Sequence, residues 1–144
     1  MKDDAFKIRL FKTKKLNSIK PEDIKMLADF IKFASDFLKF PATFHIKMLH
    51  ASPDEPITLG AYSPDTDEIH VIVENRHFLD YCRTIAHEMV HQRQKSQGKL
   101  TGTIPEIGGE IEDEANFMSG RIMKSYIKNH LTSEQKKKLG AGTY

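Results

Sequence analysis

Two histidines, His87 and His91, stand four residues apart inside a segment with helical periodicity. Apolar residues recur along one stripe of residues 78–97, which predicts a helix there, and Gly98 suits the position just after its end. Side chains four apart on a helix lie one above the other, so both imidazoles can reach the same ion. Two histidines leave a zinc site incomplete, because catalytic zinc normally has three protein ligands. A second element must therefore pack against this helix and supply another ligand.

Of the three residues between the two histidines, only Glu88 has an ionisable side chain, and it directly follows His87. Zinc lowers the pKa of a bound water to about 7, and a carboxylate beside that water can accept its proton. Because Glu88 adjoins the first ligand, it can reach the open coordination position without filling it. The pattern over residues 87–91 therefore predicts zinc ligands at His87 and His91 and a general base at Glu88.

The third ligand has to come from further along the chain. The metzincin pattern requires a glycine and a histidine at positions that hold Gln94 and Gln97 here, which excludes that class. His130, the only later histidine, lies at the far end of the last long predicted helix. The acidic cluster that opens this helix is the better source, and it consists of Glu110, Glu112, Asp113 and Glu114.

Glu112 is the preferred carboxylate in this cluster because Asn116 follows it by four residues on the same helix face. A metal-bound histidine usually donates its other N–H to a fixed acceptor, and the Asn116 amide oxygen could orient His87 in this way. Glu110 has another acid, Glu114, at the same offset. Glu110 and Glu114 remain alternatives to Glu112, and acids that do not bind metal would complement the helix dipole.

The helix, strand and turn signals in the rest of the sequence predict an α+β fold. Pro21 suits a first helical position, and the apolar periodicity that follows predicts a helix up to Phe40-Pro41. Residues 43–49, 57–62 and 68–73 have the composition of short strands separated by turns, and their spacing suggests a three-stranded meander. Two more helices are expected after the loop over residues 99–109, at residues 110–129 and 132–139.

A chain of 144 residues is long enough for one domain with a core, so residues 1–144 are expected to form a single domain. The composition, with 39% hydrophobic residues, suits a globular protein and contains no apolar run of membrane-spanning length. The acidic start at Asp3 and Asp4 does not resemble a secretory signal, and the single Cys82 fits a reducing compartment. We therefore expect a cytoplasmic protein.

Charge is segregated along the chain although the net charge is only +2. Residues 1–20 and residues 121–144 are basic, while the segment between them is acidic. The run Lys136-Lys137-Lys138 has no interleaved aromatic residues and no recognised binding motif around it. We therefore expect a solvated surface rather than a nucleic-acid interface.

Residues 87–91 followed by residues 112–116, which read Glu-Asp-Glu-Ala-Asn, resemble the gluzincin type of zinc metallopeptidase. The compact size and the Glu-x-x-Ala-Asn element are similar to the ImmA/IrrE-like and SprT-like metallopeptidases of bacteria and phages. The resemblance covers about residues 57–127 and implies a minimal zincin fold. It also implies a role for each matching residue: His87, His91 and Glu112 as zinc ligands, Glu88 as general base and acid, and Asn116 as the group that orients a ligand.

The leading hypothesis is a zinc-dependent peptidase whose extended peptide or protein substrate adds to a sheet edge. A zinc-stabilised binding or assembly protein without turnover is the main alternative. Binding of a polyanion and hydrolysis of a non-peptide amide are two further ones. Substrate specificity, oligomeric state and the donor that stabilises an oxyanion are left open by the sequence, the donor candidates being Tyr126, His130, His77 and Arg83.

Overall fold

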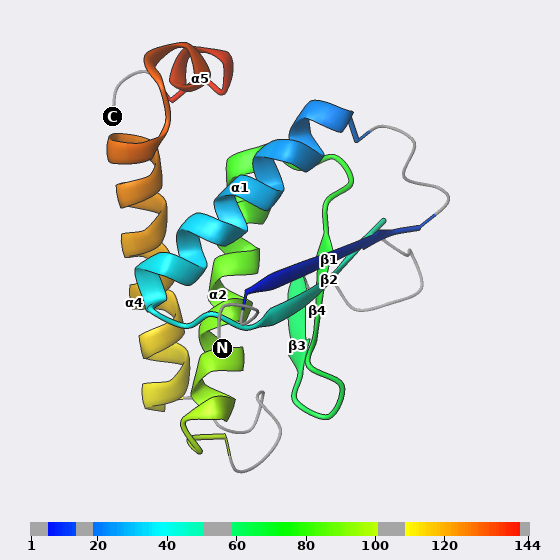
Figure 1. Cartoon of the computed structure of the whole chain (residues 1–144), viewed down its shortest axis with the longest axis vertical. Helices are drawn as coiled ribbons and strands as arrows, with labels where there is room; N and C mark the ends of the chain where they lie inside the picture. Colours follow the sequence, from blue (N-terminus) through cyan, green and yellow to red (C-terminus); the bar gives the residue numbers. More distant parts are fainter. Residues whose placement is uncertain (1–5, 14–18, 51–58, 101–108, 142–144) are drawn as a thin grey trace.

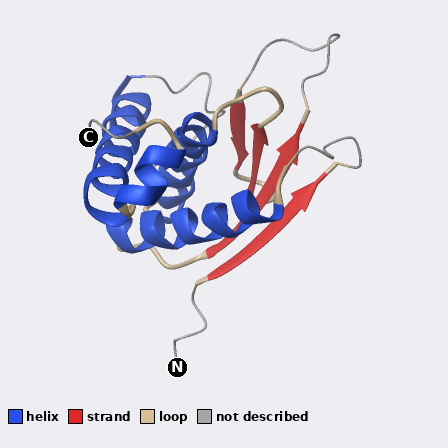
Figure 2. Cartoon of the chain, turned by 90° about the horizontal axis from the view of Figure 1, so that it is seen from above, coloured by secondary structure: helices blue, strands red, loops and turns tan. Residues whose placement is uncertain are grey.

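The computed structural model describes residues 6–13, 19–50, 59–100 and 109–141. These residues form an α+β fold in which helices cover one face of a small mixed sheet (Figures 1 and 2). In chain order the elements are β1 (Lys7–Lys12), α1 (Pro21–Leu38), β2 (Thr43–Leu49), β3 (Gly60–Ser63), β4 (Glu68–Ile72), α2 (Phe78–Ser96), α4 (Gly109–Ser125), the π-helix η1 (Tyr126–His130) and α5 (Ser133–Lys138).

The sheet has four strands in the order β1-β2-β4-β3. β1 runs parallel to β2, β2 runs parallel to β4, and β3 pairs antiparallel with β4. The expected three-stranded meander is therefore wrong in two respects, since β1 was missed and β3 does not lie between its neighbours in sequence. β4 takes the inner position because its Ile69 and Val71 are fully buried, whereas β3 is short and carries the small residues Gly60 and Ala61.

The predicted helix after Pro21 is confirmed as α1. Pro21 opens it, and Glu22 and Asp23 in the first turn complement the positive end of its dipole. It ends where Lys39 adopts a left-handed conformation with φ 52°. In the sequence, α1 connects the parallel strands β1 and β2, and its buried face packs into the core.

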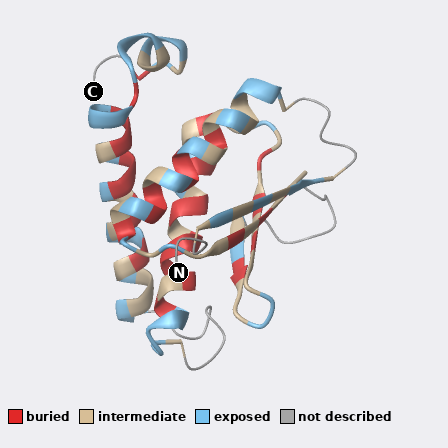
Figure 3. Ribbon diagram, viewed as in Figure 1, coloured by how far each residue is buried: buried red, intermediate tan, exposed pale blue. Residues whose placement is uncertain are grey.

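The core lies between the sheet and the helices, and the buried faces of α1, α2 and α4 turn toward it (Figure 3). Alternation on β2 sends Phe44, Ile46 and Met48 inward, as the period of a strand dictates. α2 contacts both β3 and β4 on one side and α4 on another. The helix that carries the histidines therefore lies between the edge of the sheet and the helix that carries the acidic cluster.

The long helix expected over residues 110–129 is divided into α4 and η1, and the short one that follows is α5. Tyr126 at the start of η1 is fully buried and packs edge-on against Phe30 of α1. Thr132 and Gln135 form a capping box that begins α5. Among the described residues, no helix combines the length and apolar character needed to span a membrane.

Candidate metal centre

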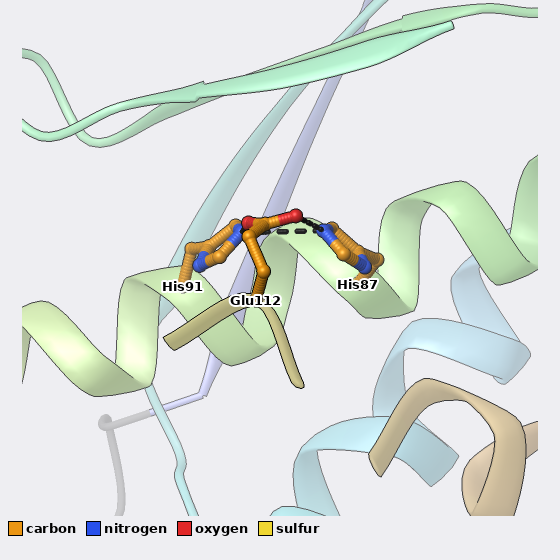
Figure 4. A group of neighbouring side chains, drawn as sticks. All are labelled: His87, His91 and Glu112. Carbon is orange, nitrogen blue, oxygen red and sulfur yellow. Dashed lines mark hydrogen bonds and ion pairs between the residues drawn. The ribbon is translucent and has the colours of Figure 1, made fainter. Parts of the chain in front are cut away.

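α2 and α4 bring together one ligand atom from each of His87, His91 and Glu112, as Figure 4 shows. The two Nε2 atoms of the histidines are 3.2 Å apart. The Glu112 carboxylate spans the pair, with Oε1 2.6 Å from His91 Nε2 and Oε2 3.4 Å from His87 Nε2. Such a group could hold a metal ion, and its members are the three ligands expected from the sequence.

Two imidazole nitrogens and a carboxylate oxygen form a donor set that suits a transition-metal ion such as zinc. Ligand atoms at 2.0–2.1 Å from a tetrahedral zinc are about 3.3 Å from one another, close to the 3.2 Å between the two histidine nitrogens, whereas the 2.6 Å between Glu112 Oε1 and His91 Nε2 is shorter. Glu112 Oε1 is buried and has no hydrogen-bond partner among the described residues. A buried acceptor without a donor is costly, and a cation between these atoms would satisfy it.

The surroundings of His87 disfavour its charged form. Burial lowers the pKa of His87 below its usual value, and the neighbouring His91 acts in the same direction. The contact with Glu112 and a hydrogen bond with the Asn116 side chain raise it. Asn116 therefore lies beside His87, the partner expected from its spacing, and a neutral imidazole is the form that binds a metal.

Glu88 is almost fully buried, with 7% of its surface exposed. Burial raises the pKa of Glu88 to about 8, and the negative charge of Glu112 adds to the effect. A Cβ atom placed at Gly60 of β3 would lie 3.5 Å from Glu88 Oε2. Glu88 thus points toward the edge strand and lies close enough to Glu112 for the charge of Glu112 to affect its pKa.

The other acids of the cluster have different surroundings. Glu110 is exposed and is not a member of the group that could hold a metal. Glu114 Oε1 accepts a 2.8 Å hydrogen bond from Gln94, which lowers the pKa of Glu114 more than the nearby Lys99 and Arg93 do. Of the three carboxylates considered from the sequence, the structure brings Glu112 to the two histidines.

Two residues beside the cluster were missed by the sequence analysis. Gln94 is fully buried, and its Oε1 lies 2.7 Å from His91 Nδ1. Its spacing of three from His91 on a helix was the available signal, but Gln94 entered only as a departure from the metzincin pattern. The second missed residue is Gly60. Nothing in its sequence context indicates how closely β3 approaches α2.

Three of the candidates for oxyanion stabilisation lie outside the metal cluster, and two of them, His77 and His130, have polar partners elsewhere. Tyr126 is enclosed in the core. His77 caps the start of α2 by accepting the Leu79 N–H, and its Nε2 lies 3.0 Å from the Leu139 carbonyl oxygen. His130 pairs with Asp29 at 2.9 Å. These contacts assign none of the three to the metal cluster.

In comparisons with known proteins, no family model, no curated protein and no solved structure matches this chain.

Proposed function

We propose that this chain is a zinc-dependent metallopeptidase. The observation that carries the proposal is the convergence of two imidazole nitrogens and the Glu112 carboxylate, whose buried Oε1 accepts no hydrogen bond among the described residues, between α2 and α4. Two histidines and one carboxylate are a common ligand set of catalytic zinc, which keeps one coordination position for water. The resemblance of residues 87–91 and 112–116 to gluzincins supports the same hypothesis, that of a zinc-dependent metallopeptidase.

In this proposal His87, His91 and Glu112 hold the ion. Bound zinc polarises a carbonyl group and lowers the pKa of water. Glu88 is the residue that accepts a proton at its carboxylate and later returns it to the leaving amine. Its burial supports this role, because a carboxylate in a water-poor setting binds a proton more tightly than one in solvent, and a base works best with a pKa near the working pH.

The edge of the sheet supports a peptide as the substrate. β3 is the outermost strand beside β4, and its Gly60 approaches Glu88. An extended peptide can add to such an edge through main-chain hydrogen bonds, which do not depend on the side chains of the substrate. A peptide bound along β3 would carry its carbonyl groups past the proposed base.

Hydrolysis by the full-length chain tests the proposal. We expect the zinc-loaded protein to cleave a fluorescently labelled unfolded protein such as casein, and a chelator to abolish cleavage. Glu88→Gln should lose cleavage by about 100-fold or more, since general base catalysis contributes about 10²–10⁴-fold, while retaining zinc. Glu110→Gln is the matched control on the exposed face of α4 and should retain both properties.

Cleavage assays combined with zinc binding also distinguish the peptidase proposal from the main alternative. In a zinc-stabilised binding or assembly protein, wild type and Glu88→Gln would bind zinc equally and neither would cleave any member of a broad peptide library. That result would overturn the peptidase proposal and leave the metal site intact.

A further inference from the structure

Gln94 connects the two helices that carry the proposed ligands. Its Oε1 lies 2.7 Å from His91 Nδ1, and its Nε2 donates to the Ile111 carbonyl oxygen at 3.0 Å and to Glu114 Oε1 at 2.8 Å. The side chain is fully buried, so each of these contacts replaces a hydrogen bond to water.

We propose that Gln94 is a positioning residue that fixes the tautomer of His91 and holds the start of α4 so that Glu112 faces the metal. The inference rests on the proposed metal binding and adds a residue that acts through two ligands without touching the ion.

The orientation of the Gln94 amide follows from its partners. The carbonyl oxygen of Ile111 can only accept a hydrogen bond, so the amide end that faces it must be the NH₂ group. The amide oxygen then faces His91 Nδ1. Because that oxygen can only accept, the proton of a neutral His91 ring lies on Nδ1, and Nε2 carries the lone pair.

This tautomer changes the meaning of the 2.6 Å contact between His91 Nε2 and Glu112 Oε1. The contact is an ion pair only where Nε2 carries a proton. In the Nδ1–H tautomer two lone pairs face each other, which agrees with the lack of any donor to Glu112 Oε1 among the described residues. A cation held by both atoms would turn this repulsion into attraction.

The NH₂ end of Gln94 acts on the second helix. Ile111 precedes Glu112 directly, and Glu114 follows two residues later. Two hydrogen bonds from one rigid amide therefore flank the carboxylate ligand and set the position of its backbone relative to α2. Loss of Gln94 would leave His91 free to change tautomer and would weaken the contact between α2 and α4 beside the site.

Zinc affinity of two variants tests the inference. Gln94→Met keeps the volume and removes all three hydrogen bonds. Gln92→Met is the matched control, because Gln92 is a buried glutamine on the same helix whose Nε2 donates to Thr43 O, away from the ligands. Removal of a group that orients a metal ligand typically costs about 10–100-fold in affinity, so we expect that loss for Gln94→Met and less than about threefold for Gln92→Met.

The d–d absorption of cobalt(II) bound in place of zinc gives a second readout, and we expect it to change in Gln94→Met only. Equal affinities and equal spectra for wild type and Gln94→Met would overturn the inference. The proposed function does not depend on that result. Failure of the wild type to bind zinc would instead contradict the proposed function, and the tautomer of His91 would then be tested by the NMR measurement below.

The tautomer can be measured without any Gln94 variant, in case Gln94→Met does not fold. Nitrogen-15 NMR of the metal-free wild type distinguishes Nδ1–H from Nε2–H imidazoles, with His91→Gln used to assign the signal. We expect the Nδ1–H form at His91 when the ring is neutral, and a dominant Nε2–H form would overturn the inference.

Discussion

Gly60 of β3 and Thr84 of α2 approach so closely that a Cβ atom at position 60 would lie 2.3 Å from Thr84 Cγ2. Backbone of the edge strand thus touches the helix one turn before Glu88. A side chain at position 60 would force β3 away from α2 at the point where the proposed substrate edge and base meet.

Gly60→Ala should therefore destabilise the protein by about 1–3 kcal/mol, the usual cost of overpacking, and reduce peptide cleavage while zinc stays bound. Thr84→Ser removes Cγ2 and keeps the hydroxyl that accepts a hydrogen bond from Arg76 at 2.7 Å. The double variant should regain much of the loss. Urea unfolding and cleavage assays of the double-mutant cycle measure the coupling, and strictly additive effects would contradict the clash.

The pH dependence of stability reports on Glu88 in the metal-free protein. Burial raises the pKa of Glu88 from 4.5 to about 8, so the folded state binds this proton more tightly than the unfolded state does. The resulting stabilisation is complete below pH 4.5 and is lost as the pH rises through about 8. Between these limits the wild type should lose up to about 1.4 kcal/mol per pH unit relative to Glu88→Gln, whose amide does not titrate. Urea unfolding in chelator at pH 5 and pH 8 measures the difference, and equal pH slopes would refute it.

The third ligand can be identified by exchanging carboxylates for amides. Glu112→Gln should weaken zinc binding by at least about 100-fold, more than the loss of a group that only orients a ligand. Glu110→Gln, two residues earlier and exposed, should bind zinc like the wild type. Competition with a chromophoric chelator gives both constants. A larger loss in Glu110→Gln than in Glu112→Gln would transfer the ligand role to Glu110.

Zinc should also stabilise the fold, because it binds the folded state at a site shared by α2 and α4. At a free concentration of 100 times the dissociation constant, the free energy of unfolding should rise by about 2.7 kcal/mol. Glu88→Gln should keep this gain, whereas His91→Ala should lose it. If zinc stabilised His91→Ala as much as the wild type, binding would have to occur elsewhere.

Much of the helical framework could be predicted from the sequence because its signals are local. Pro21 and the acids after it mark the start of α1, and the apolar periodicity after Phe78 marks α2. The spacing of His87 and His91 fixes their common face as soon as the segment is helical. Glu112 lies on another helix, and it was chosen through its spacing to Asn116 and the resemblance of residues 112–116 to gluzincins.

Strand order could not be predicted because it depends on contacts between distant residues. The alternation of Lys7, Ile8, Arg9 and Leu10 was a readable signal for β1, but its basic residues were interpreted only as surface charge. No local pattern specifies that β2 pairs parallel with β4 and leaves β3 at the edge. The role of Gln94 was hidden likewise, since its contacts with Ile111 and Glu114 depend on how α4 packs against α2.

Zinc content after loading and desalting of the full-length protein decides whether His87, His91 and Glu112 form a metal site. We expect one zinc per chain in the wild type and less than about one tenth in His91→Ala, because two remaining ligands cannot retain the ion against dilution. A wild type that binds no zinc at micromolar concentration, or a His91→Ala variant that retains a full equivalent, would contradict this account.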